Sequence, residues 1–518
     1  MKNVSSFSGL ISNRREFLQL GAALGLTCVT PVNAAVAEER PKKGGKLNLA
    51  LLGGSSSDSL DPAKFNDIVV RVIGYAVCNQ LVELTSDNKL IPELAVSWET
   101  ADNVKWTIKL RNDVTFHNGK PFDATDVLYS LNMHMGSDTK SGAKAMFEEV
   151  DHVGQVDLHT VEVTLKSPNA DFIYVFADYH VMIVPNGFAA FTSLIGTGGY
   201  ELVSFEPGLR ATLKRNTNYW KTDRAHVELV EIAVINDATA RSAALRAGSA
   251  DIINAVNPKL INMMKNVPGF EVVRAPAGYY PTFVARSDLE PTSDNNIRLA
   301  LKYAIDREQL LKLSVGGYGV VANDQPIPPT NPYFNPNIEQ TQYDPERSKF
   351  FLKKAGLTKL RIELFTSETV CAGAIDMATL YSQQARNSNI DIQVERRPAD
   401  GYWSDIWMKK QFFMGAWINR PADQTFSLIF KSGVPWNEGY WKNERFDSLL
   451  SSAKAELNFE KRKELYGQMQ VMLAQQGPSI IPLFIDNLDA KGPRVRGFEP
   501  SAVEALSGSR VIERVWLV

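Results

Sequence analysis

The chain has 518 residues, with 56 Lys and Arg against 58 Asp and Glu, and a formal net charge of −2. This near balance argues against a nucleic-acid binder, which needs a strong positive excess. Three cysteines cannot supply a disulfide framework for a chain of this length, so apolar cores must hold the fold. Roughly 480 residues follow the N-terminal segment, too many for one core, and we expect two or three subdomains.

The first 37 residues have the pattern of a signal peptide. Arg14 and Arg15 precede Phe17-Leu18, and an apolar run with several small residues extends to about Val32. That run is too short and too rich in Gly and Thr to span a bilayer, which takes about 20 apolar residues. The small-x-small pattern at 35–37 predicts cleavage after Ala37. The twin arginines predict export of the folded protein to the periplasm through the Tat route.

A membrane-anchoring or buried helix is the alternative for this segment, but the order basic, apolar, small is typical of signal peptides. Cys28 follows Thr27, an unfavourable residue before a lipid-attachment cysteine, so we predict a free periplasmic protein. Without residues 1–37, 53 basic and 57 acidic residues remain, a net charge of −4. No later stretch of the sequence is apolar enough to span a membrane. The sequence does not say whether the two remaining cysteines, Cys78 and Cys371, pair.

The segments that follow mix strand and helix patterns. Period-two alternation or an apolar run predicts strands at 44–51, 105–110 and 161–165, with a Gly/Ser loop at 53–57. Capping residues and helical periodicity predict helices at 123–131, 238–247, 297–313, 444–457 and 460–476. This uneven alternation predicts α/β lobes with mixed sheets.

A series of short motifs then identifies a family resemblance. The motifs are IPELAVSWE at 91–99, WTIKLR at 106–111, VTFHNGKPF at 114–122, GTGGY at 196–200, LKRN at 213–216 with Tyr219-Trp220, RLAL at 298–301, YAIDR at 303–307 and PIPP at 326–329. In this order and spacing they resemble the family 5 extracellular solute-binding proteins, the peptide/nickel-type receptors of ABC importers. The resemblance covers almost all of the chain after the signal segment.

The resemblance implies an α/β, bilobal class II periplasmic-binding-protein fold with an extra subdomain on the N-terminal lobe. By analogy the first lobe holds residues 45–281 with 490–518, and the second lobe holds residues 282–484. The chain would cross between lobes near 279–284 and 484–489, and these crossings would form the hinge. A ligand buried between two lobes stabilises the closed state over the open one.

The implied function is a non-catalytic periplasmic receptor that captures a small solute and delivers it to the permease and ATPase subunits of an importer. We expect a monomer without cofactor, metal or nucleic-acid partner. Peptide transport and opine transport are both candidate roles. The alternative is a periplasmic chaperone or enzyme on the same scaffold, since fold alone does not fix function. Stoichiometric, saturable binding without turnover distinguishes a receptor from both.

The stretch GAWINRPADQTF at 415–426 is the main candidate ligand loop, and its candidate ligand-binding residues are Trp417, Asn419, Arg420 and Asp423. In peptide-binding relatives this loop carries an aspartate just after the tryptophan, which pairs with the ligand's ammonium group. Here Asn419 and Arg420 follow Trp417. Because a guanidinium group pairs with carboxylates or phosphates, an opine, a sugar phosphate or another anion gains weight over a standard peptide. Alternatively, Arg420 is exposed or paired with Asp423.

Further ligand-binding candidates are Trp436 and Asn437, in a loop that resembles a family ligand loop, together with Tyr280 at the hinge and Ser57, beside Asp58, in the Gly/Ser loop. The polar loop 136–141 could reach an anion or be a solvated turn. For Trp403, Trp407 and Trp441 we favour an ordinary core position.

Catalytic and metal-binding patterns are missing from the sequence. The six histidines are scattered along the sequence and form no metal-binding motif. No Cys-x-x-Cys, P-loop, Gly-x-Ser-x-Gly or dinucleotide-binding pattern occurs. Capture of a metal complex, as in nickel-binding relatives, stays a minor alternative.

Overall fold

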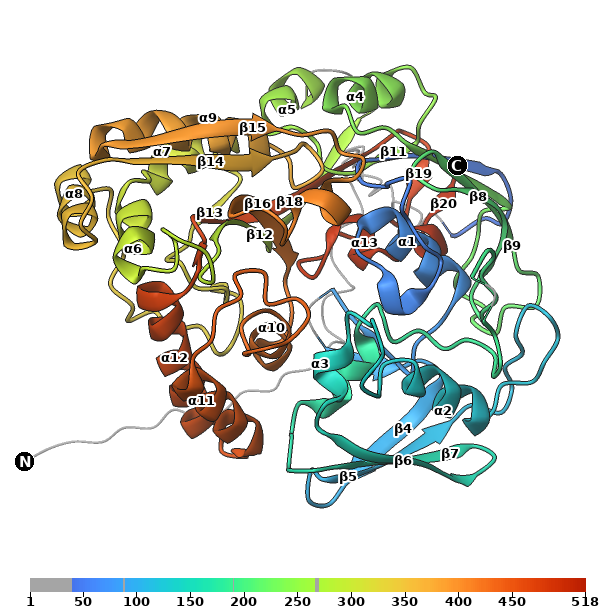
Figure 1. Ribbon diagram of the computed structural model, residues 1–518. Helices are drawn as coiled ribbons and strands as arrows, with labels where there is room; N and C mark the ends of the chain where they lie inside the picture. Colours follow the sequence, from blue (N-terminus) through green and yellow to red (C-terminus); the bar gives the residue numbers. More distant parts are fainter. Residues whose placement is uncertain (1–39, 87–88, 190, 266–269) are drawn as a thin grey trace, which may run out of the picture. The chain divides into compact units, whose positions relative to one another are not determined.

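Figure 1 shows a computed structural model of the chain, which describes residues 40–86, 89–189, 191–265 and 270–518. The predicted signal peptide, its twin arginines and Cys28 lie outside the described residues. Residues 41–518 form one compact body with a mixed α/β structure.

Most of the strands are short, and β12 is the longest of them. They are β1 (Lys46–Leu51), β2 (Val82–Leu84), β3 (Leu90–Pro92), β4 (Ala95–Thr100), β5 (Lys105–Leu110), β6 (Val150–Asp157), β7 (Thr160–Leu165), β8 (Tyr200–Glu206), β9 (Arg210–Arg215), β10 (Leu229–Val234), β11 (Ile252–Ile253), β12 (Glu271–Ala285), β13 (Gly319–Val321), β14 (Leu360–Thr366), β15 (Ile390–Arg396), β16 (Phe412–Ile418), β17 (Ser479–Ile480), β18 (Leu483–Lys491), β19 (Val495–Arg496) and β20 (Trp516–Leu517).

The helices are distributed between these strands. They are α1 (Ile68–Val77), α2 (Ala124–Asn132), α3 (Lys144–Phe147), α4 (Ala238–Arg246), α5 (Pro258–Lys265), α6 (Asn295–Tyr303), α7 (Arg307–Ser314), α8 (Pro345–Lys354), α9 (Ala374–Ala385), α10 (Ala422–Ile429), α11 (Glu444–Ala455), α12 (Phe459–Gln476), α13 (Ala505–Gly508) and α14 (Val511–Arg514). A single π-helical turn at Tyr402–Ile406 adds to them within the described residues.

The structure confirms most of the elements that strand alternation and helix caps predict. The strands at 44–51, 105–110 and 161–165 correspond to β1, β5 and β7. Asp123 caps α2 and forms a capping box with Asp126, as its acidic first turn predicts. The helices at 238–247, 444–457 and 460–476 correspond to α4, α11 and α12.

The single helix predicted at 297–313 is wrong, because two helices occupy it. α6 ends at Tyr303, and α7 begins at Arg307. Asp306 adopts an extended conformation between them, and its side chain accepts a hydrogen bond from the Gln309 amide. An aspartate that competes for helix N–H groups in this way favours a new N-terminus over a continuous helix.

The large sheet runs through both predicted lobes. Among the described residues it has the order β15-β14-β16-β12-β18-β11-β1-β10-β9-β8, with β13 and β17 added to β18 and β12. The long strands β12 and β18 pair antiparallel at its centre, where Tyr279 lies opposite Ile485. The predicted crossings 279–284 and 484–489 therefore lie within these two neighbouring strands (Figure 1).

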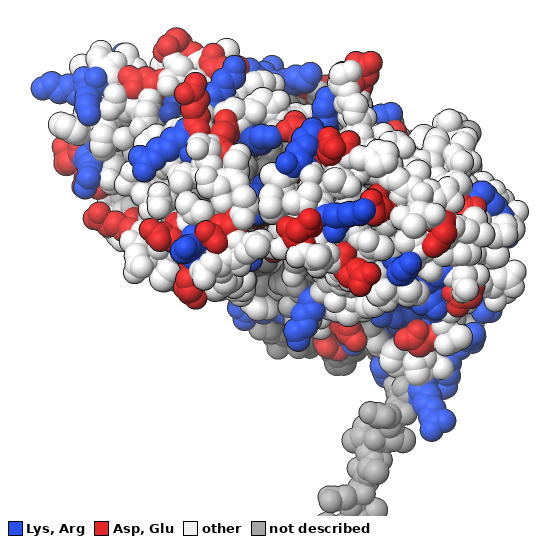
Figure 2. All heavy atoms as spheres, turned by 90° about the horizontal axis from the view of Figure 1, so that it is seen from below, with Lys and Arg blue, Asp and Glu red and all other residues white. Residues whose placement is uncertain are grey.

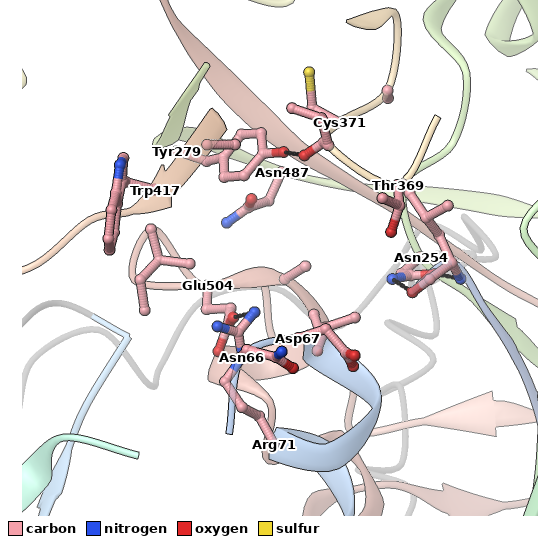
Figure 3. A pocket seen from close by; sticks show the side chains of 18 of the residues that line it. Asn66, Asp67, Arg71, Asn254, Tyr279, Thr369, Cys371, Trp417, Asn487 and Glu504 are labelled. Carbon is pink, nitrogen blue, oxygen red and sulfur yellow. Dashed lines mark hydrogen bonds and ion pairs between the residues drawn. The ribbon is translucent and has the colours of Figure 1, made fainter. Parts of the chain in front are cut away.

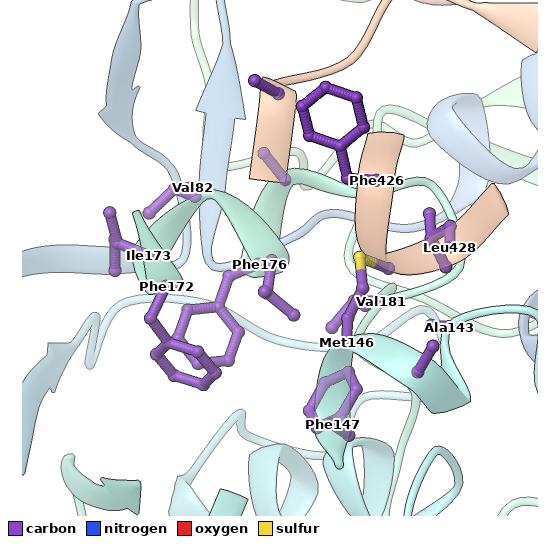
Figure 4. Close-up of a cluster of buried hydrophobic side chains, with 14 of the residues drawn as sticks. Val82, Ala143, Met146, Phe147, Phe172, Ile173, Phe176, Val181, Phe426 and Leu428 are labelled. Carbon is purple, nitrogen blue, oxygen red and sulfur yellow. The ribbon is translucent and has the colours of Figure 1, made fainter. Parts of the chain in front are cut away.

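A separate sheet, β4-β5-β7-β6, lies outside the large one and matches the extra subdomain expected on the first lobe. Its apolar side chains continue into a cluster that also takes in α10 from the second predicted lobe. In Figure 4, Phe426 and Leu428 of α10 lie beside Met146 and Phe147 of α3. All four side chains are at most 3% exposed, so burial fixes the position of α10 against α3.

Candidate functional site

A cavity of about 320 Å³ lies between residues of the two predicted lobes. Figure 3 shows its wall, in which Arg71 and Asp67 belong to α1 and its cap while Trp417 belongs to β16. Residues from 485–488 in β18 and Tyr279 in β12 also line it, so the predicted hinge strands are part of the wall. The lining is mainly apolar and aromatic, as expected for an enclosed small-molecule site.

Four tryptophans from the second predicted lobe form one side of the cavity. Trp407 is the centre of the group, with ring centroids 6.0 Å from Trp403, 6.1 Å from Trp417 and 6.1 Å from Trp436. Trp403 and Trp407, which the sequence favoured as ordinary core, therefore line the cavity instead. Trp403 belongs to the π-helical turn at Tyr402–Ile406 and Trp407 follows it directly, so this turn brings both rings to the cavity.

Trp436 extends from the second predicted lobe into a recess of the first. Its ring centroid lies 5.0 Å from that of His180. A Cβ atom placed on Gly142 would lie 2.5 Å from Cζ2 of Trp436 and 2.6 Å from Nε2 of His180. Only glycine at position 142 therefore leaves room for this ring.

Arg71 forms a buried ion pair with the C-terminal part of the chain. Its Nη2 lies 2.7 Å from Oε1 of Glu504, whose second oxygen accepts from the Ser509 hydroxyl at 2.6 Å. The Arg71 guanidinium also lies over the ring of Tyr179, 4.7 Å from its centroid. Asp67, the cap of α1, holds Arg71 at the cavity by fixing the first turn.

Arg420 contacts the same tyrosine and pairs with Asp178 rather than Asp423. Its Nε donates to Oδ2 of Asp178 at 3.3 Å, and its guanidinium lies 5.1 Å from the Tyr179 centroid. Oδ1 of Asp178 lies 2.6 Å from Nδ1 of His180. Burial opposes the charge of Asp178, but His180 and Arg420 together hold the pKa of this carboxyl group below its ordinary value.

A second, smaller cavity of about 40 Å³ adjoins the first, and Tyr179, Ile418, Arg420 and Glu504 line both. Asn419, Pro421 and Gln424 at the start of α10 line only the smaller one. The loop 419–424 therefore forms part of the wall between the two cavities.

The Gly/Ser loop contacts the second predicted lobe beside the cavity. Oδ1 of Asp400 accepts from the Ser55 hydroxyl at 3.0 Å, the Ser56 hydroxyl at 2.8 Å and the Ser56 amide at 2.9 Å. Because Asp400 lies three residues before Trp403, the segment that binds this loop also carries part of the aromatic wall.

Asp58 and Asp67 form a carboxyl pair behind the same loop. Oδ2 of Asp58 accepts from the Ser55 amide at 2.9 Å, and Oδ1 of Asp67 accepts from the Val69 amide at 2.8 Å. Burial, and then the nearby charge of Asp67, raise the pKa of Asp58 to about 9. Burial and the neighbouring Asp67 therefore both favour the protonated form of Asp58.

The predicted ligand residues fall into two groups. Trp417, Arg420 and Trp436 line the main cavity, as does Lys140 of the polar loop. Tyr280 does not, because strand alternation sends Tyr279 into the cavity and Tyr280 to the opposite face of β12. There its ring packs against Phe484 with centroids 5.9 Å apart.

The others have structural contacts instead. Asn437 closes its own loop, since Nδ2 donates to the Trp441 carbonyl at 2.6 Å and Oδ1 accepts from the Trp441 amide. Asp423 lies 3.5 Å from Lys454 and outside both cavities. Ser57 lies outside them too, with its hydroxyl 3.0 Å from that of Ser55.

Sequence reasoning missed several wall residues, including Arg71, Tyr179, Glu504 and Gln424. Arg71, Tyr179 and Glu504 come from segments without a distinctive motif, and α1 and residue 504 are far apart in the chain. Gln424 lies in the candidate ligand loop, but its type does not single it out there. Tyr279 could have been chosen over Tyr280 only with the phase of the strand, which two adjacent tyrosines do not reveal.

Other features of the described residues bear on which chemistry the protein can perform. Cys78 and Cys371 are buried free thiols. No group of three or more His, Cys, Asp or Glu side chains in the described part of the chain is placed to hold a metal ion. The helices that the structure describes are each too short or too polar to cross a membrane. Acidic and basic side chains are interspersed on the face shown in Figure 2.

Comparison with known proteins decides the family. The family model described as "Bacterial extracellular solute-binding proteins, family 5 Middle" matches residues 89–438. The chain belongs to this family. It is therefore a solute-binding protein with a bilobal α/β fold, of the type that serves ABC importers, and its family consists of binding proteins.

Two curated relatives and one solved structure illustrate the range of the family. The chain is 28% identical over 477 residues to heme-binding protein A of Haemophilus influenzae, covering 84% of this chain and 87% of that protein. It is 28% identical over 460 residues to the dipeptide-binding protein of Escherichia coli, covering 78% and 82%. The structure of AgaA from A. tumefacien in complex with agropinic acid matches with a TM-score of 0.84 and 22% identity, over 92% of this chain and 99% of that one.

Proposed function

We propose that this protein is a periplasmic receptor that encloses a small, carboxylate-bearing, amino-acid-derived solute, such as a short peptide or an opine, between its two lobes. The observation that carries the proposal is the cavity of about 320 Å³ whose wall combines aromatic side chains with two arginines, the buried Arg420 and the half-buried Arg71. Ligand cavities range from about 300 to 1000 Å³, so this size favours a dipeptide or an opine over a long peptide or a heme.

Arg71 and Arg420 support a carboxylate on the solute. Both line the cavity, and both keep their charge because guanidinium groups do not lose a proton in proteins. The relatives point the same way, since a dipeptide and agropinic acid both carry carboxylate groups. A sugar phosphate would satisfy the arginines as well.

The experiment is to purify the protein from its own host and record a native mass spectrum. We expect one retained small molecule per chain, and re-addition of that molecule to the stripped protein should raise the melting temperature without being converted to product. Turnover of the molecule, or protection of unfolded proteins without a preferred small molecule, would support the enzyme or chaperone alternative instead.

The lobe boundaries remain part of the proposal, with residues 45–281 and 490–518 in one lobe and 282–484 in the other. The pairing of β12 with β18 supports a two-strand hinge. Small-angle scattering should show a smaller radius of gyration when the retained solute is added. An unchanged radius with saturating solute would argue against closure about this hinge.

Export through the Tat route is also proposed rather than established. The twin arginines Arg14 and Arg15 support it. Changing both to lysine should leave the protein in the cytoplasm of its host, as measured by fractionation and immunoblot. Normal periplasmic delivery of that variant would exclude the Tat route.

A further inference from the structure

The small cavity at the start of α10 has no assigned role. It holds about 40 Å³, against roughly 30 Å³ for a water molecule in the liquid. Arg420 and Tyr179 line both this cavity and the larger one, so the two cavities adjoin at these side chains. The space suits a single functional group of a bound solute and not a whole solute.

Two hydrogen-bond donors at this cavity have no acceptor. Nη2 of Arg420 and Nε2 of Gln424 are buried and make no hydrogen bond within the part of the chain that the structure describes. The two residues are only 6% and 4% exposed. Because a buried donor without an acceptor is destabilising, a pair of them marks a place where an acceptor belongs.

The start of α10 adds further donors. The helix begins at Ala422 after Pro421, and no side chain caps its first turn. The first N–H groups of a helix lack partners within the helix, and the helix dipole favours negative charge there. A helix start beside an arginine and a glutamine amide is suited to an anion.

The acidic residues nearby are already paired. Asp178 contacts His180 and Nε of Arg420, and Glu504 contacts Arg71 and the Ser509 hydroxyl. Asp423 lies in the first turn of α10 but faces Lys454, outside the small cavity. The donors of Arg420 and Gln424 are therefore the groups left for a ligand.

We infer that the small cavity is an anion subsite, in which Arg420 Nη2, Gln424 Nε2 and the first turn of α10 bind a carboxylate group of the solute. The inference rests on the proposed function, since the rest of the solute would lie in the main cavity. It also assigns Gln424 as a further binding residue, whose amide donates to the same carboxylate group as Arg420.

The first test uses bromide, so it does not depend on the identity of the solute. The mature protein is crystallised with sodium bromide after removal of any retained molecule, and anomalous diffraction locates the ion. We expect a peak between Arg420 and Gln424 that is absent in Gln424→Leu and retained in Gln475→Leu, the same change on the exposed end of α12. A map with bromide elsewhere and none at this cavity would overturn the anion subsite.

The second test compares a dipeptide panel with the corresponding C-terminal amides by calorimetry. Wild-type protein should bind the acid forms about tenfold more tightly than the amides, Arg420→Gln should reduce this ratio to near one, and Gln424→Leu should weaken the acid forms several-fold. An acid-to-amide ratio unchanged in Arg420→Gln, or an affinity for the acid forms unchanged in Gln424→Leu, would reject the subsite. If no panel member binds but bromide does, the peptide-like solute is wrong and the subsite stands.

Discussion

Two buried arginines, Arg510 and Arg420, lie over tyrosine rings and differ in how completely they are paired. Arg510 lies 4.5 Å from the Tyr75 centroid, and both of its terminal nitrogens have partners. Nη1 and Nη2 donate to the two carboxylate oxygens of Glu93 at 2.9 and 3.0 Å, and Nη2 also donates to Gln80 at 3.2 Å. Arg420 donates through Nε to Asp178 and leaves Nη2 without a hydrogen-bond partner in the described residues.

This difference distinguishes Arg510, whose ion pair is structural, from Arg420, whose remaining donor can bind a ligand. A fully paired arginine gains nothing from a ligand, because every donor already has an acceptor. A partly paired arginine is held in place by one carboxylate and still has a donor available. Arg420 is a candidate ligand-binding residue because it lines a cavity and has a donor without an acceptor. These two features are stronger evidence than its position in the sequence.

The largest effect should follow the loss of the structural pair. Arg510→Ala leaves Glu93 buried without its main cation, and removing one partner of a buried pair costs about 3–5 kcal/mol. Urea denaturation should show this loss in the free energy of unfolding. A loss below about 1 kcal/mol would mean that Lys221, 2.7 Å from Glu93, compensates by itself.

Removal of Arg420 should act mainly on binding. Arg420→Ala should weaken binding of the retained solute by more than about 1.4 kcal/mol, a tenfold loss in affinity, as measured by calorimetry. Its effect on stability should be smaller than that of Arg510→Ala, because His180 still contacts Asp178. Unchanged affinity, with stability reduced as in Arg510→Ala, would make Arg420 a structural residue like Arg510.

A larger side chain at position 142 would fill the recess that holds the Trp436 ring. This change tests whether Trp436 enters the recess only when the two lobes close around the solute. Gly142→Ala places a methyl group within 3 Å of Trp436 and His180, and overpacking of this kind costs about 1 kcal/mol or more. We expect the affinity for the solute to fall several-fold, with little change in urea denaturation of the solute-free protein. Equal losses in both measurements would show that the recess is part of the folded core in every state.

The last prediction concerns pH and the pair of Asp58 with Asp67. Burial raises the pKa of Asp58 in the folded protein, so the folded state holds a proton that the unfolded state releases near pH 4. Stability should therefore fall as pH rises above 4. Asp58→Asn keeps a neutral donor to Asp67 and should melt at a higher temperature than wild type at pH 8, with no difference at pH 4. Parallel melting curves across this range would exclude the shared proton.

The sequence predicted elements with strong local signals, and the family resemblance supplied the bilobal fold. Asp123 predicted the start of α2 because a capping box is local, whereas Asp306 was overlooked inside an apolar periodic stretch. At the site, Trp417 and Arg420 were found because they belong to a motif. Arg71 and Glu504 were not, because their pairing depends on the tertiary fold and neither has a partner nearby in the chain.

The ion pairs Arg71–Glu504 and Arg510–Glu93 join the first part of the chain to its last twenty residues. Until residues 504–510 have left the ribosome, these pairs cannot form and the wall for the solute is incomplete. Recognition of the solute therefore arises late in synthesis, once these residues are available for pairing. A protein that crosses the membrane already folded, as the Tat proposal requires, would have to wait in the cytoplasm for that pairing.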